Sequence, residues 1–299
     1  MTEPVLFNAT LGGSAALLSA AAWALSSILF RRLGDEASPS GMNLGKCIIG
    51  TLALGAILAF TGMQLVSLRD FIYLGLSGLL GIALGDTLFF MALMNLGPRL
   101  ALLLGALGPV FTVVMALLFL GERPSLQVWG GIAATLAGVN WVIWESVPKE
   151  AVERGHRMKG IWYGVLSIFC NSAGIILAKA GVSSVSALEG SFIRFFWGML
   201  GLLAAGVFAG QLKAWLAPFS DKGRMRLLMS AVLVAIFGGF WMFMLALKHI
   251  DASVAVVLNE TAPLFVLPMA WFMLKEKISP RSIVGAVIAV AGIVLIFIN

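Results

Sequence analysis

Two carboxyl groups, Asp86 and Glu260, lie inside long apolar segments of this sequence. A charge at the centre of a membrane helix costs about 2.5–3.5 kcal/mol on insertion scales, so such residues usually have a partner or line a substrate pathway. Either carboxylate could bind a substrate ammonium group or carry a proton. The alternative for Asp86 is a hydrogen-bonded structural carboxyl. The alternative for Glu260 is a position close to the lipid headgroups.

Two basic residues, Lys46 and Arg194, stand near the starts of two further apolar segments. Long basic side chains near a helix end can extend their charged groups to the membrane surface while their stems stay in apolar surroundings. We therefore expect both residues to serve as anchors at the headgroups.

Two prolines, Pro109 and Pro263, lie in the interior of apolar segments. Proline removes one helical hydrogen bond and frees the carbonyl four residues earlier, here at Gly105 and Asn259. A free carbonyl at membrane depth must be satisfied by protein or by a watery cavity. Both carbonyls could bind a substrate ammonium group at a hinge; the alternative is a kink that a neighbouring helix satisfies.

Two tryptophans, Trp23 and Trp241, lie deep in their segments, where an indole N–H needs a partner. The sequence predicts an amphipathic substrate cavity, with ordinary core packing as the alternative for each residue. The predicted binding residues are Trp23, Ser26, Asp86, Phe89, Phe90, Gly105, Asn171, Trp241, Asn259 and Glu260.

These residues belong to a unit that the chain contains twice. Residues 85–138 recur in pattern as residues 239–292 without a gap, so that Pro109 corresponds to Pro263 and Glu122 to Glu276. Such internal repeats identify a duplicated structural unit. Upstream, Ser19 pairs with Ser167 and Lys46 with Arg194 at a slightly different offset. We predict a first repeat over residues 1–148, a linker over 149–159 and a second repeat over 160–299.

The composition requires a lipid environment. The chain is 60% hydrophobic and 11% charged, whereas average proteins are about 25% charged. Apolar segments of this length span a bilayer, and in lipid their backbone groups must pair within a helix. We predict an all-α integral membrane protein with ten spans: 13–30, 42–62, 71–95, 99–119, 125–145, 160–181, 187–210, 227–248, 252–273 and 280–298.

Each repeat then contains an odd number of spans, so the second must enter the membrane from the opposite side. This predicts two inverted five-helix repeats with a substrate site near the midplane between them. The distribution of Lys and Arg among the loops places both termini outside the cell by the positive-inside rule.

Several other functions lack support in the sequence. Motifs of serine hydrolases, zinc proteases and phosphate-binding loops do not occur, and Cys47 and Cys170 lie singly in apolar segments. The net charge of +6 lies in loops, without the basic and aromatic pattern of nucleic-acid binding. We expect no catalytic residue, metal or cofactor. The expected partners are a small-molecule substrate and the lipid bilayer, without nucleic acid, and the chain is compatible with a monomer. An intramembrane enzyme would need Asp86 and Glu260 as a carboxyl pair.

The stretches from Pro109 to Glu122, followed by the letters RPS, and from Pro263 to Glu276, followed by KIS, resemble the EamA-type members of the drug/metabolite transporter superfamily. Within that superfamily the chain is similar to bacterial amino-acid exporters. The resemblance implies ten helices around a central cavity, cytoplasmic termini and a bacterial inner membrane. It implies export of apolar or aromatic amino acids and related metabolites. The alternative is a permease for nucleotide sugars, phosphorylated metabolites or drugs, which would need a cationic midplane.

Overall fold

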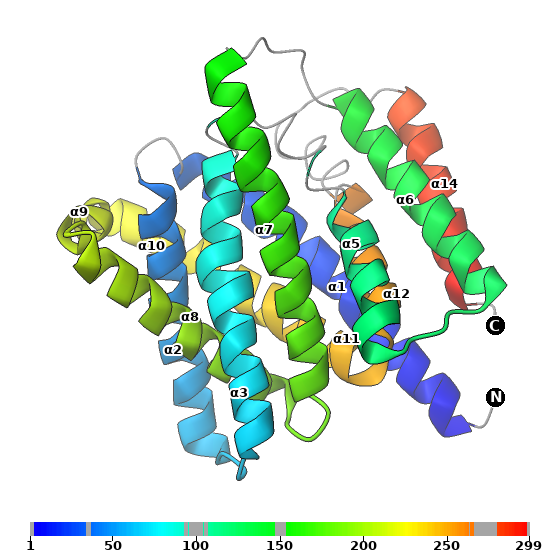
Figure 1. Ribbon diagram of the computed structural model, residues 1–299, viewed down its shortest axis with the longest axis horizontal. Coiled ribbons are helices and arrows are strands. Elements are labelled where there is room, and N and C mark those ends of the chain that lie inside the picture. Colours follow the sequence, from blue (N-terminus) through cyan, green and yellow to red (C-terminus); the bar gives the residue numbers. More distant parts are fainter. Residues whose placement is uncertain are drawn as a thin grey trace.

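The computed structural model describes residues 3–33, 37–92, 95, 104, 107–146, 154–262, 264–265 and 280–297. Every element within these ranges is a helix, which confirms the predicted all-α class (Figure 1). The start of α1 (Glu3–Leu33) and the end of α14 (Pro280–Phe297) lie on the same side of the molecule in this view.

Six helical stretches in the described part of the chain are long and apolar enough to cross a membrane. Three of them are continuous helices or lie within one: α1 (Glu3–Leu33), α7 (Arg154–Gly181) and α2 (Pro39–Thr61). A fourth is α8 (Ala187–Phe208). The other two combine several elements. One joins α3 (Leu68–Ser77) to the π-helix η1 (Gly78–Gly85), and the other joins α10 (Lys222–Leu233), the π-helix η4 (Val234–Trp241) and α11 (Met242–His249).

The other described elements are not among these six stretches. They are α5 (Gly108–Met115), η2 (Ala116–Leu120), α6 (Leu126–Ser146), α9 (Leu212–Leu216), η3 (Ala217–Ser220), α12 (Ala252–Asn259) and α14 (Pro280–Phe297).

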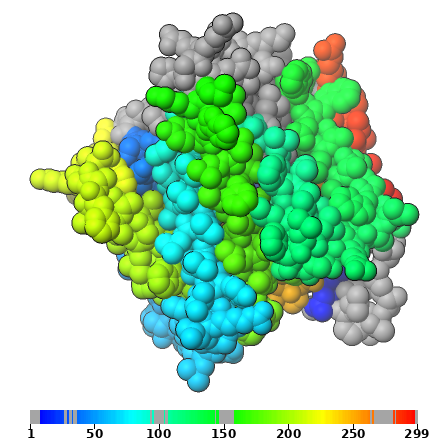
Figure 2. All heavy atoms as spheres, in the orientation of Figure 1, coloured from blue at the N-terminus to red at the C-terminus, as the bar shows by residue number. Residues whose placement is uncertain are grey.

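The outer surface of the bundle carries large apolar side chains, as expected where the solvent is lipid. Figure 2 shows the face of the molecule that is formed largely by α3, α7 and the stretch from α5 to α6. Examples of exposed apolar residues are Phe60, Leu118, Phe119, Trp162 and Phe208. Because a soluble protein rarely exposes so many contiguous apolar groups, this surface fits a bilayer.

Helix starts follow the expected capping chemistry. The Ser38 side chain accepts a hydrogen bond from the backbone N–H of Gly41, and Pro39 occupies the first turn of α2, where its missing N–H costs nothing. Ser186 and Glu189 form a reciprocal capping box at the start of α8.

The helices α6 and α14 pack against each other along a row of glycines and lie side by side in Figure 1. A Cβ atom added to Gly131 would contact the Gly292 carbonyl, and one added to Gly138 would contact the Gly285 carbonyl. From Gly131 to Gly138 the chain advances along α6, while the glycines in contact with them go back along α14 from Gly292 to Gly285. The two helices are therefore antiparallel. Small residues permit this close approach where lipid supplies no hydrophobic drive between helices.

Candidate functional site

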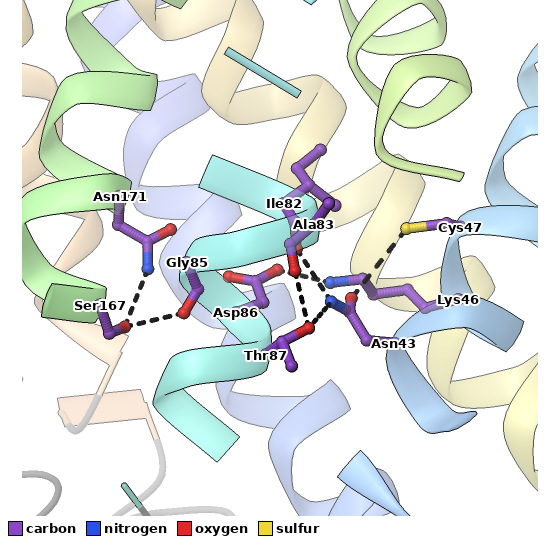
Figure 3. A network of polar contacts seen from close by, with 10 residues as sticks. All are labelled: Asn43, Lys46, Cys47, Ile82, Ala83, Gly85, Asp86, Thr87, Ser167 and Asn171. Carbon is purple, nitrogen blue, oxygen red and sulfur yellow. Dashed lines mark hydrogen bonds and ion pairs between the residues drawn. The ribbon is translucent and has the colours of Figure 1, made fainter. Parts of the chain in front are cut away.

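The predicted carboxylate Asp86 forms an ion pair in the interior of the bundle. Its Oδ2 atom lies 2.6 Å from Lys46 Nζ, and the two side chains are 23% and 5% exposed respectively (Figure 3). Lys46 belongs to α2, whereas Asp86 directly follows η1. The expectation that Lys46 reaches the headgroups is therefore wrong. The lysine lies roughly two turns into its helix. The Asp86 carboxylate stabilises its charge there in place of hydration.

The wide turns of η1 are completed by side chains from the helices on either side. Asn43 Nδ2 donates to the Ile82 carbonyl at 2.9 Å, and Ser167 Oγ donates to the Gly85 carbonyl at 2.8 Å. Asn43 comes from α2 and Ser167 from α7, on opposite sides of η1 (Figure 3). Irregular helical turns at membrane depth need such partners, and π-helical turns are frequent at functional sites.

The same arrangement recurs in the second copy, around η4. Ser19 Oγ lies 2.9 Å from the Gly239 carbonyl, just as Ser167 lies beside the Gly85 carbonyl. The predicted residues Trp23 and Asn171 occupy equivalent places. A Cβ atom at Gly239 would lie 3.2 Å from Trp23 Nε1, and one at Gly85 would lie 2.8 Å from Asn171 Nδ2. The two glycines therefore give Trp23 and Asn171 room to lie against the π-helices.

An aromatic cluster centred on Phe240 connects the first copy with the second. The ring centroid of Phe240 lies 4.8 Å from that of Trp23 and 4.8 Å from that of Phe195. Lys46 Nζ lies 5.1 Å from the same centroid, which is within the range of a cation–π interaction. Phe240, which corresponds to Asp86 in the repeat, is not among the binding residues predicted from the sequence.

Arg194 is also in the interior of the protein. It is 5% exposed and its Nη1 atom lies 3.3 Å from Met244 Sδ. The prediction of a headgroup anchor is therefore wrong for Arg194 as well as for Lys46. The bundle buries both cations.

The other predicted binding residues lie in varied surroundings. Ser26 is fully buried and donates to the Trp23 carbonyl at 3.2 Å. Phe89 and Phe90 form a tilted ring pair with centroids 6.0 Å apart, and Trp241 has Phe237 as its ring neighbour, also at 6.0 Å. Gly105 and Pro263 lie outside the described residues.

The fourth and ninth predicted spans are interrupted at equivalent places. α5 begins at Gly108 after a turn at Leu107, and α12 ends at Asn259 before a turn at Glu260 and Thr261. In the repeat, Leu107 corresponds to Thr261. Pro109 lies in the first turn of α5, where helices accept proline readily. Pro109 thus begins a helical segment, whereas the sequence analysis placed it in the interior of a span as a hinge or a kink.

The ends of these segments carry two further predicted residues. Asn259 Oδ1 lies 2.6 Å from Ser19 Oγ, which ties the end of α12 to α1. Glu260 caps the C-terminus of α12 and is partly exposed. Within the described residues, no hydrogen bond or ion pair engages its carboxylate.

Glu122, from the motif that carries the family resemblance, has a structural role that the sequence did not reveal. Its carboxylate accepts from the Ala252 N–H at 2.6 Å, from the Ser253 N–H at 3.1 Å and from the Ser253 hydroxyl at 2.6 Å. It therefore caps α12 in the other copy. Partial burial, and then the charge of Glu122, raise the pKa of the neighbouring Asp251 carboxyl above its usual value, while Lys179 opposes this shift.

This fold and motif define a membrane transporter. The model of the EamA-like transporter family matches residues 10–144 and again residues 158–298. The chain therefore belongs to the EamA-like transporter family and is a multi-pass membrane protein.

Individual relatives are distant. The "Uncharacterized transporter YdfC" of Bacillus subtilis (strain 168) is 24% identical, over 88% of this chain and 83% of that protein. The "Probable terminal-alkyne amino-acid exporter" of Streptantibioticus cattleyicolor is 26% identical, over 94% of this chain and 92% of that protein. The "UDP-galactose transporter homolog 1" of Yarrowia lipolytica is 23% identical, over 50% of this chain and 43% of that protein.

The fold also occurs in a solved crystal structure. The match has a TM-score of 0.76 at 17% identity and covers 96% of this chain and 95% of the other. At that identity the likeness concerns the fold alone.

Proposed function

We propose that the protein is a secondary transporter that exports small apolar or aromatic amino acids and related metabolites by alternating access. In this proposal the chain forms ten spans as two inverted five-helix repeats, divided as 1–148 and 160–299 around the linker 149–159. It functions in a bacterial inner membrane with a central cavity between the repeats.

The observation that carries the proposal is an exchange of contacts between equivalent positions. The Ser19–Gly239 contact is the counterpart of Ser167–Gly85. In the same way, Gly50 faces Ile236 while Gly198 faces Ile82, and the α6–α14 glycines exchange places. When residue i of one unit contacts residue j of the other and j contacts i in return, a twofold relation connects the units. In transporters such an axis in the membrane plane places the substrate site at the repeat interface.

An amphipathic zwitterion suits the chemistry of this interface. The rings of Trp23 and Phe240 offer an apolar wall beside the Lys46–Asp86 pair. The Glu260 carboxylate, at the break between helical segments, is available to an ammonium group or to a proton. The Streptantibioticus relative is named as an exporter of amino acids of one kind, which supports the same substrate class.

A second candidate is the export of anionic metabolites. The burial of both Lys46 and Arg194 supplies the cationic interior that such substrates need. The relative named as a UDP-galactose transporter homologue matches half of this chain. The single negative charge of Asp86 can offset only one of the positive charges of Lys46 and Arg194, which leaves a net positive charge for an anionic substrate.

Flux measurements in proteoliposomes test the proposal. Purified protein should accelerate the uptake of radiolabelled leucine, phenylalanine or a similar amino acid over protein-free vesicles, with saturation kinetics. A panel of all common amino acids, with a nucleotide sugar and a sugar phosphate added, separates the two candidates. Rates equal to those of empty vesicles across the whole panel would refute both.

A further inference from the structure

Arg194 is a buried cation that has no matching carboxylate. Of its polar atoms, Nη1 has only the thioether sulfur of Met244 as an acceptor, at 3.3 Å, and Nε has no hydrogen-bond partner. The residue is 5% exposed. In the described part of the chain, no carboxylate lies within ion-pair distance of its guanidinium; the acidic charge that acts on it from farther away is that of Asp86, which is paired with Lys46.

This arrangement is costly unless the site binds something. A thioether is a weak acceptor, and a guanidinium keeps its charge in proteins, so the cost of burial cannot be avoided by loss of a proton. A charge inside a membrane protein that lacks a partner indicates a functional position. The five N–H donors of arginine match carboxylate and phosphate oxygens in a two-pronged geometry.

The repeat shows what is missing beside Arg194. Lys46 is the equivalent residue of the first copy, and it is paired with Asp86. The position equivalent to Asp86 in the second copy is Phe240, whose ring cannot neutralise a cation. Arg194 faces Met244, one turn beyond Phe240 on the same transmembrane stretch. The second copy therefore keeps the cation of the pair without the anion.

The surroundings of Arg194 place it at the same interface as the predicted binding residues. A Cβ atom added to Gly81 would lie 3.6 Å from Arg194 Nη2 and 3.9 Å from Asn171 Oδ1. Gly81 belongs to η1, one turn before Gly85 and Asp86. The guanidinium thus lies between η1 of the first copy and α11 of the second.

We propose that Arg194 binds the carboxylate of the substrate. In the second copy the substrate carboxylate pairs with Arg194 in the same way that Asp86 pairs with Lys46 in the first. This inference rests on the proposed function and specifies its substrate class: a molecule with a free carboxylate attached to an apolar body. A positive charge on the substrate is secondary at this position.

Ligand analogues test the inference without any substitution. Four probes share one apolar body: L-phenylalanine, its amide, phenethylamine and 3-phenylpropionate. Binding is measured by ligand-induced thermal stabilisation of the wild-type protein in detergent, and competition by inhibition of amino-acid uptake in proteoliposomes. We expect the two carboxylates to bind and compete, and the amide and the amine to do so at least about tenfold more weakly, since a charge-assisted bond is lost.

Variants then assign the effect to Arg194. R194Q should weaken binding of both carboxylates about tenfold or more and bring them level with the amide and amine. R194K keeps the positive charge but loses the two-pronged donor geometry of the guanidinium. Its affinity for the carboxylates should lie between those of the wild type and R194Q. R69Q is the matched control, because it removes the charge of an exposed arginine that stacks on Tyr73. This variant should bind the four probes as the wild type does.

The outcomes separate the inference from the proposed function. Uptake in which the amine and amide compete as well as the carboxylates overturns the inference and leaves the transport proposal intact. Equal carboxylate preference in wild type and R194Q, with R194Q monodisperse and folded, also overturns it. Carboxylate-selective stabilisation that depends on Arg194, but without any flux, supports the inference and refutes transport. If R194Q does not fold, the four probes measured on the wild type and on R194K still test whether binding depends on a substrate carboxylate and on the guanidinium.

Discussion

At the scale of single residues, the Lys46–Asp86 pair joins two opposite charges inside the described structure. Its 2.6 Å contact joins α2 to the end of η1 in the protein interior. Removing one partner of a buried pair leaves an uncompensated charge, which typically costs about 3–5 kcal/mol, whereas removing both can be nearly neutral.

We expect K46M and D86N each to lower the thermal stability of the purified protein strongly. The double variant K46M/D86N should be clearly more stable than the sum of the two single effects, because it leaves no unpaired charge. Thermal unfolding in one detergent, followed by tryptophan fluorescence, provides the double-mutant cycle. Additive effects of the two substitutions would contradict the coupling.

Glu260 provides the second prediction at this scale. Its position after α12 and the absence of a described partner make it the candidate proton carrier. E260Q should abolish any acceleration of uptake by an imposed pH gradient while leaving uptake without a gradient measurable, because an amide cannot carry the proton.

The measurement is radiolabelled uptake with and without the gradient. D221N is the matched control: Asp221 caps α10 in an exposed loop, and asparagine caps a helix equally well. If the pH gradient accelerates uptake by E260Q as much as uptake by the wild type, a group other than Glu260 carries the proton.

The sequence indicated that Asp86 needs a partner but assigned the wrong role to that partner. Lys46 is close to the start of a span when position is counted along the chain, and that favoured a headgroup anchor. Depth in a helix alone does not show which side of the helix faces a neighbour. Only the tertiary fold, in which the side chains of Asn43 and Lys46 reach from α2 to the Ile82 carbonyl and to Asp86, brings the two charges together.

At the scale of elements, most predicted spans correspond to helices with small differences at their ends. The span 187–210 corresponds to α8, and 125–145 to α6. The predicted first span begins at residue 13, whereas the helix α1 that contains it begins ten residues earlier, at Glu3. The apolar pattern marks the part of a helix that lies in lipid, whereas the helix itself extends into polar surroundings. Closely spaced glycines occur in the π-helices η1 and η4 but not in η2, so no common sequence pattern marks these turns.

The α6–α14 contact allows a sharp test of close helix packing. A Cβ atom at Gly131 would lie 2.8 Å from the Gly292 carbonyl, whereas one at Gly130 would lie 3.5 Å from Leu295 Cδ2, an ordinary contact. We expect G131A to destabilise the protein by about 1–3 kcal/mol through overpacking against backbone.

G130A is the control on the adjacent residue and should be neutral or stabilising by a few tenths to about 1 kcal/mol, since alanine favours helices. Thermal unfolding of both variants in the same detergent is the measurement. Equal losses in G130A and G131A would show that helix propensity, and not the contact with α14, controls the result.

At the scale of the whole molecule, the decisive feature is the inverted relation of the two copies. The loop after α2 and the loop after α8 are equivalent in the repeat. Leu65 in the first and Lys213, near the start of α9, are both exposed. Five predicted spans separate them, an odd number, so the two positions should lie on opposite faces of the membrane. Two copies with the same orientation would place both on one face.

Cysteine labelling with a membrane-impermeant thiol reagent tests this directly. The native thiols Cys47 and Cys170 are buried, so C47A/C170A gives a silent background into which L65C and K213C are introduced singly. In intact cells one variant should react, and the other should react only after permeabilisation. Two predicted spans, 13–30 and 42–62, separate the N-terminus from Leu65, so both should lie on the same side of the membrane. Labelling of L65C in intact cells would therefore favour the outside termini that the loop charges predict. Labelling of K213C would favour the cytoplasmic termini that the family resemblance implies. Reaction of both variants from one side would refute the inverted repeat, and with it the exchanged contacts as the basis for alternating access.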